Sequence, residues 1–153
     1  MSFGAFFEYP GDAVPATSAP DAAVLLPELD DSGWNTLISY MQVSRFAQGD
    51  VIVAAGTYSR SLSVVADGIA VIETPDGAVA VETGAVLGEV PFFDGRPHDA
   101  TIRARTDVDL LALSPEAFDV LAAREPLLAR TLLFDLGRIL ALRLRQALVK
   151  PGG

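Results

Sequence analysis

The chain has 153 residues, half of them hydrophobic and 20% charged, which is enough to bury one sizeable core in a single globular domain. Its 11 basic and 20 acidic residues give a net charge of −9. A surface that binds nucleic acid would have to overcome the repulsion between this negative charge and the phosphates. No cysteine and one histidine exclude disulfides, thiol nucleophiles, zinc clusters and three-histidine metal centres. We therefore expect no catalytic or metal-binding residues and no contact with DNA.

Residues 1–30 differ from the rest of the chain. Four prolines interrupt them, and no period of 2 or 3.6 residues is sustained. We interpret this part as an extended, Pro- and Ala-rich arm. Its first nine residues hold four aromatic side chains that are candidates for docking into a protein partner: Phe3, Phe6, Phe7 and Tyr9. The alternative is that the arm packs on its own domain.

The chain shows neither a basic leader followed by an apolar run nor a continuous apolar stretch long enough to span a bilayer. From these missing signals we expect no membrane span. We also expect a cytoplasmic protein.

Residues 42–114 alternate β-branched and apolar runs with turns that contain glycine or proline. This spacing predicts seven or eight short strands and is typical of a barrel, roll or sandwich. Thr74-Pro75-Asp76-Gly77 is a turn sequence, because proline pre-sets φ and glycine accepts a positive φ. It predicts a β-hairpin from about Ile69 to Val81.

Helices are expected on both sides of the strands. Apolar residues at helical spacing predict a short first helix, capped by Asp31 or Ser32. Ser114-Pro115 is a helix start, so two further helices are predicted at about 115–125 and about 127–149.

The long final helix has more apolar residues than one packing face needs. One stripe is expected to pack on the strands and contains Leu133, Leu136, Leu140, Leu144 and Ala147. The other is a candidate surface for a protein partner and contains Leu128, Leu132, Ile139 and Leu142. Such a partner includes a second copy in a homo-oligomer; the alternative is that the domain and the arm bury this stripe themselves.

Charge is unevenly divided along the chain. Residues 1–123 hold 5 basic and 18 acidic residues, whereas residues 124–153 hold 6 basic and 2 acidic ones. The basic residues of the final helix complement the helix dipole, and they are also suited to an acidic partner.

The loop between the predicted hairpin and a later strand reads LGEVPFFDGRPHDAT, from Leu87 to Thr101. It resembles the phosphate-binding cassette of cyclic-nucleotide-binding domains, in which a G-E-x-A stretch and a variable loop precede an R-[AS]-A-T stretch. The residues at matching places are Gly88, Glu89, Val90, Pro91, Ala100 and Thr101. The order of helices and strands around the loop agrees with that family.

The resemblance covers about residues 32–149 and implies a mainly β fold with flanking helices. The expected fold is an eight-stranded β-roll, of the double-stranded β-helix or jelly-roll type, with a short N-terminal helix and a C-terminal helix pair. With the arm set aside, the domain is predicted to comprise residues 31–150.

The resemblance also implies a ligand chemistry. In members that bind cAMP or cGMP, the cassette glutamate holds the ribose 2′-hydroxyl and the cassette arginine holds the cyclic phosphate. Glu89 matches the glutamate, but His98 stands at the arginine's place and Asp99 follows it. A lost charge-assisted contact costs about 1.5–3 kcal/mol, or roughly ten- to more than a hundredfold in affinity. Arg96 could compensate only across Pro97, which separates it from the cassette stretch.

The candidate ligand residues are Gly88, Glu89, Val90, Arg96, His98, Asp99, Ala100 and Thr101. The alternative for this loop is structural: Glu89 begins a short helix, and Phe92 or Phe93 fills the space that a purine would occupy. We expect no resident cofactor, with cAMP or cGMP as the alternative. The favoured function is a non-enzymatic interaction module in a larger assembly, docking through the arm, the final helix or both. The alternative is a cAMP or cGMP sensor that moves its final helix.

Overall fold

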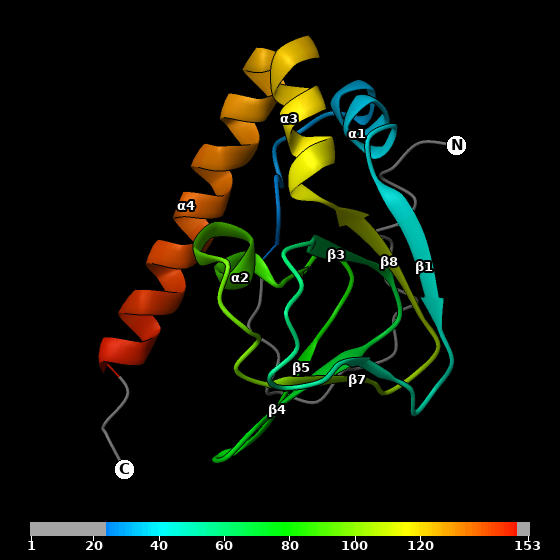
Figure 1. The fold of residues 1–153 in the computed structure, drawn as a ribbon, viewed down its shortest axis with the longest axis vertical. Helices are drawn as coiled ribbons and strands as arrows, with labels where there is room; N and C mark the ends of the chain where they lie inside the picture. The colour runs from blue at the N-terminus through cyan, green and yellow to red at the C-terminus, as the bar shows by residue number, and fades with distance from the viewer. Residues whose placement is uncertain (1–23, 150–153) are drawn as a thin grey trace.

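The computed structural model describes residues 24–149. Within these residues, eight strands form two four-stranded antiparallel sheets in the orders β1-β8-β3-β6 and β2-β7-β4-β5, and four helices flank them (Figure 1). In chain order the elements are α1 (Asp31–Ile38), β1 (Gln42–Phe46), β2 (Val51–Val53), β3 (Leu62–Asp67), β4 (Ala70–Thr74), β5 (Gly77–Val81), β6 (Val86–Leu87), α2 (Glu89–Asp94), β7 (Thr101–Ala104), β8 (Val108–Leu113), α3 (Pro115–Arg124) and α4 (Pro126–Val149). The predicted β-roll with its closing helix pair is confirmed.

The hairpin between β4 and β5 forms as the turn sequence predicts. The strands pair from Ala70 with Val81 to Thr74 with Gly77, and Gly77 has a φ of 137°. The side chain of Thr74 donates a hydrogen bond to the Gly77 carbonyl, which closes the turn at 2.9 Å.

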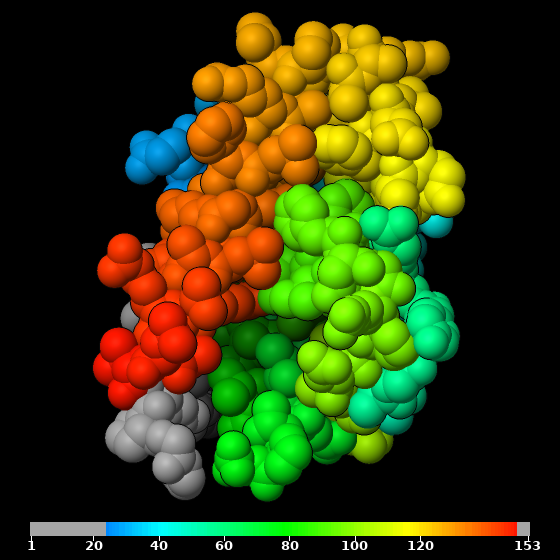
Figure 2. All heavy atoms as spheres, turned by 60° about the vertical axis from the view of Figure 1, so that its left-hand side comes forward, coloured from blue at the N-terminus to red at the C-terminus, as the bar shows by residue number. Residues whose placement is uncertain are grey.

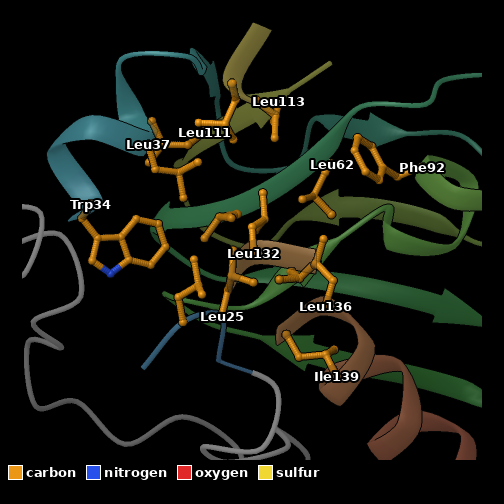
Figure 3. Packing of buried hydrophobic residues seen from close by; sticks show 14 of the residues in the cluster. Leu25, Trp34, Leu37, Leu62, Phe92, Leu111, Leu113, Leu132, Leu136 and Ile139 are labelled. Atoms are coloured by element: carbon orange, nitrogen blue, oxygen red, sulfur yellow. The ribbon is translucent and has the colours of Figure 1, made fainter. Parts of the chain in front are cut away.

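Two apolar clusters make the core. One lies between the two sheets and includes Val65, Ile102 and Leu110. The other joins one sheet to the helices, and Figure 3 shows Leu132, Leu136 and other α4 side chains packed among residues of α1, β3 and β8. Helix α4 is therefore held along one face of the roll by its own core residues.

The helix starts follow the expected chemistry with one change of residue. Asp30, not Asp31 or Ser32, caps α1, because its side chain accepts a hydrogen bond from the Gly33 amide. Ser114 caps α3 as predicted, accepting from the Ala117 amide at 3.0 Å.

The predicted arm, residues 1–30, is too long. Leu25 and Leu26 are 1% and 4% exposed and belong to the core that packs on α4. The Leu26 amide donates to Asp135 at 2.6 Å, and Arg138 donates to the Val24 carbonyl at 2.8 Å. Apolar burial and these bonds make residues 24–30 part of the domain; the four aromatic candidates of the arm lie outside the described residues.

The expected division of the final helix into a packing stripe and a partner stripe is wrong, whereas the alternative, burial of the second stripe by the domain, agrees with Leu132 and Ile139. The buried α4 residues are Ala129, Leu132, Leu136 and Ile139, which mix members of both stripes. Leu132 and Ile139, expected on a partner surface, are 1% and 0% exposed because they lie in the core. The other partner candidates, Leu128 and Leu142, are half-buried, and Leu128 packs against the same core.

Candidate functional site

A cavity of about 290 Å³ lies where the loop of residues 87–102 meets α4. Figure 2 shows the hollow between α4, coloured orange to red, and the green segments of the roll. Its wall contains Ile72 of β4, Val86 of β6 and Arg143 of α4; the other lining residues lie between 87 and 102. The candidate site is therefore bounded by elements far apart in the sequence.

Gly88 sets the entry to α2. It has a φ of 76°, and a Cβ at this position would lie 2.9 Å from the Ser61 carbonyl oxygen and 3.3 Å from the His98 ring. Glycine is required here for two reasons. Any other residue would be strained at this positive φ, and its Cβ would clash with the Ser61 carbonyl oxygen. The turn places Glu89 in the first turn of α2, as the structural interpretation of this loop predicts.

Glu89 has a partner inside the protein. It is 7% exposed, and its carboxylate accepts a hydrogen bond from Nη1 of Arg143 in α4. The second terminal nitrogen of Arg143 donates to the Val86 carbonyl at 3.1 Å. One guanidinium thus ties the final helix to both β6 and the start of α2.

His98 is also engaged. It is 7% exposed, and its Nε2 lies 3.0 Å from the Ser59 carbonyl oxygen. A carbonyl can only accept, so Nε2 carries the hydrogen in this bond. The His98 backbone is held as well, donating to Thr57 and accepting from Gly56. The ring is consequently fixed against the 56–59 segment.

The other predicted residues are placed as follows. Seven of the eight candidates line the cavity, namely Gly88, Glu89, Val90, Arg96, His98, Asp99 and Ala100. Thr101 is not part of the wall, and its hydroxyl accepts from the Ala55 amide at 3.1 Å. Arg96 and Asp99 are exposed residues of the wall. Two of the predicted residues thus bring opposite charges to the same cavity.

The idea that a phenylalanine fills the ligand space is wrong. Phe92 is 7% exposed and packs edge-on against Phe118 of α3, with ring centroids 6.0 Å apart. Phe93 is 43% exposed. Neither ring lines the cavity, because the turn of α2 places one in the helical core and the other at the surface. The space beside Glu89 stays open.

Sequence reasoning missed Arg143 as a site residue. The basic residues of the final helix are visible in the sequence, but nothing in their spacing selects this one for the cavity. With Arg143 included, the charged residues of the wall, apart from the histidine, are three carboxylates and two guanidiniums: Glu89, Asp94, Asp99, Arg96 and Arg143. Carboxylates therefore outnumber guanidiniums in the wall.

Residues 43–125 match the family model described as cyclic nucleotide-binding domain. The chain belongs to this family. It is 32% identical over 84 residues to a cyclic nucleotide-gated potassium channel of Rhizobium etli, which is 55% of this chain and 24% of the channel. It is 28% identical over 119 residues to such a channel of Mesorhizobium japonicum, which is 78% of this chain and 33% of the channel. The chain thus spans a quarter to a third of the length of these relatives.

Solved structures agree with the fold. A cyclic nucleotide-binding domain from Methylobacillus flagellatus superposes with a TM-score of 0.71 at 28% identity, covering 84% of this chain and 78% of that one. The Thermus thermophilus catabolite activator protein gives 0.67 at 29% identity, covering 79% and 58%. Between residues 24 and 149 no helix is both long and apolar enough to cross a bilayer.

Proposed function

We propose that this domain is a non-enzymatic interaction module of a larger assembly, in which the cyclic-nucleotide site binds weakly or not at all. The observation that carries the proposal is the engagement of Glu89 by Arg143. A ribose hydroxyl at Glu89 would compete with this guanidinium for one carboxylate. The guanidinium bond has a charge on both partners, whereas the hydroxyl bond has a charge only on the acceptor.

The place of the phosphate gives a second support. A histidine side chain, unlike an arginine, is not a permanent cation, and the Nε2–H of His98 is directed at the Ser59 carbonyl. An entering phosphate would therefore find no permanent cation at the cassette position, while Asp99 and Asp94 line the same cavity. Both carboxylates are exposed, so water and salt screen part of their repulsion, but what is left acts against an anion.

Arg96 does not supply the missing cation well. Its side chain is exposed at the rim, and its backbone amide is fixed by the Asp94 carboxylate at 2.9 Å. An exposed guanidinium in water contributes about 0–1 kcal/mol to an ion pair, which is less than the lost contact costs.

Calorimetric titration of the full chain with cAMP and with cGMP tests the proposal. We expect no heat of binding at millimolar nucleotide. Binding in the micromolar range would refute the proposed loss of ligand affinity and support the second candidate function.

That second candidate is a cyclic-nucleotide sensor, and one observation favours it: the cavity beside Glu89 is open and has Arg143 of α4 in its wall. Two relatives are named cyclic nucleotide-gated channels. In a sensor, a ligand that takes Glu89 from Arg143 would remove the polar contact between α4 and α2. The change in the equilibrium between two positions of α4 would be set by the difference in ligand affinity for those positions. Under either function we expect a cytoplasmic domain without enzymatic activity.

A further inference from the structure

The outer side of α4 carries an apolar seam that the domain does not cover. Its residues alternate at spacings of three and four along three heptads: Leu127, Arg130, Phe134, Gly137, Ala141, Leu144 and Leu148. Every one of them is exposed. The large apolar members are strongly so, with Leu127 at 78%, Phe134 at 69%, Leu144 at 60% and Leu148 at 76%. We call this set the outer seam.

The geometry of the outer seam fits another helix. A stripe that repeats every 3.5 residues keeps facing a partner helix that winds around it. A membrane surface or a sheet would favour a broader apolar face. Gly137 lies in the middle of the outer seam, and a Cβ added there would meet nothing within 4 Å. The backbone is therefore open to close approach at the centre of the stripe.

The charge around the outer seam indicates the kind of helix. Of the four arginines in α4, Arg138 is paired with Asp135 and Arg143 with Glu89. Arg130 and Arg145 are exposed and form no ion pair with any residue between 24 and 149. Arg130 lies over the Phe134 ring, 5.0 Å from its centroid, within the outer seam itself.

A second copy of the chain fits this surface poorly. Helix α4 has one acidic residue, Asp135, and that carboxylate is occupied by Arg138 and the Leu26 amide. Two outer seams facing each other would bring together cations without carboxylates to neutralise them. In a parallel pair each Arg130 would face its own counterpart, a like-charge contact that is unfavourable when water is removed.

Resting on the proposed function as an interaction module, we infer that the outer seam binds an amphipathic helix of another protein that has apolar residues in heptad positions and acidic residues beside them. The apolar side chains fill the spaces between Phe134, Leu144 and Leu148, and the carboxylates pair with Arg130 and Arg145. This partner differs from a nucleotide in site and in chemistry.

Two synthetic 21-residue peptides test the inference on the full chain. Both have leucine at positions a and d of three heptads; one has glutamate at e and g, and the other has lysine there. Because each peptide repels itself, neither pairs strongly alone. We expect the glutamate peptide to bind at least about tenfold more tightly than the lysine peptide, and its affinity to fall as salt is raised. No binding, or equal binding of both, would overturn the inference.

Variants locate the contact. Phe134→Gln combined with Leu144→Gln should weaken glutamate-peptide binding by about tenfold or more, whereas Val43→Gln, at an exposed apolar position on β1, should not. Arg130→Gln with Arg145→Gln should reduce the preference for glutamate over lysine. Binding that survives the Phe134 and Leu144 changes would contradict the assigned surface.

Analytical ultracentrifugation of the chain without peptide measures its oligomeric state and completes the test. A dimer that is lost in the Phe134 and Leu144 double variant would make a second copy the occupant and overturn the inference. A monomer, with peptide binding as above, supports it. The peptide experiments test only the partner of the outer seam, and the calorimetric titration tests only the loss of nucleotide affinity. Either proposal can therefore fail without the other.

Discussion

Arg143 of α4 donates a hydrogen bond to Glu89 of α2, a residue 54 positions earlier in the chain. The pair joins the final helix to the loop that resembles a phosphate-binding cassette. Their side chains are 29% and 10% exposed, so the contact is partly shielded from water. The ion pair adds a polar contact to the apolar packing that holds α4, and both of its residues lie in the wall of the cavity.

Removing the guanidinium should destabilise the domain. Arg143→Gln leaves the shielded Glu89 carboxylate without its cation, a change that costs about 3–5 kcal/mol for a fully buried pair. Because Arg143 is 29% exposed, we expect a smaller loss in the free energy of unfolding, roughly 1–3 kcal/mol, measured by urea denaturation. Arg145→Gln, at an exposed position of the same helix, is the control. Equal effects of the two changes would argue against a structural ion pair.

The core contribution of Leu25 is a second test. Leu25→Ala removes a side chain that is 1% exposed and should lower the free energy of unfolding by about 2–5 kcal/mol. Leu148→Ala, at a side chain that is 76% exposed, should have little effect. If Leu25→Ala proved as mild as Leu148→Ala, residues 24–30 would be a loose arm after all.

Two glycines with similar backbone angles should respond differently to alanine. Gly88 and Gly56 have φ values of 76° and 86°, but a Cβ would meet the Ser61 carbonyl at 2.9 Å only at Gly88. Gly56→Ala should cost about 1 kcal/mol for its strained backbone, and Gly88→Ala about 1–3 kcal/mol more. Thermal unfolding compares them, and the reverse order would show that the turn before α2 is not tight.

The claim that a missing arginine weakens nucleotide binding can be tested by placing a cation at position 98. His98→Arg together with Asp99→Ala should raise affinity for cAMP or cGMP by about ten- to more than a hundredfold, because it returns a charge-assisted contact and removes a carboxylate. Asp99→Ala alone is the matched control for the loss of repulsion. An unchanged affinity in the double variant would mean that a feature other than the missing arginine sets the weak binding.

Much of the fold could be predicted because its signals are local. A turn such as Thr74-Pro75-Asp76-Gly77, or a start such as Ser114-Pro115, fixes the chain over a few residues and needs no distant partner. The cassette resemblance likewise lies in one continuous loop. The sequence alone is therefore enough to predict these features.

The site and the helix faces depend on contacts between distant segments. Leucines lie on almost every side of α4, so spacing alone does not tell which ones face the roll; Leu132 and Leu144 look alike in sequence but are 1% and 60% exposed. The outer seam is identified only from the exposed fractions of these side chains in the folded structure. The contact of Arg143 with Glu89 likewise depends on how the final helix crosses the cavity, which no local pattern encodes.

The most direct test of the account is a crystal structure of the full chain grown with millimolar cAMP. We predict that the cavity beside Glu89 holds no nucleotide and that Arg143 remains bonded to Glu89. A nucleotide with its ribose on Glu89 and its phosphate on His98, with the guanidinium displaced, would contradict the account.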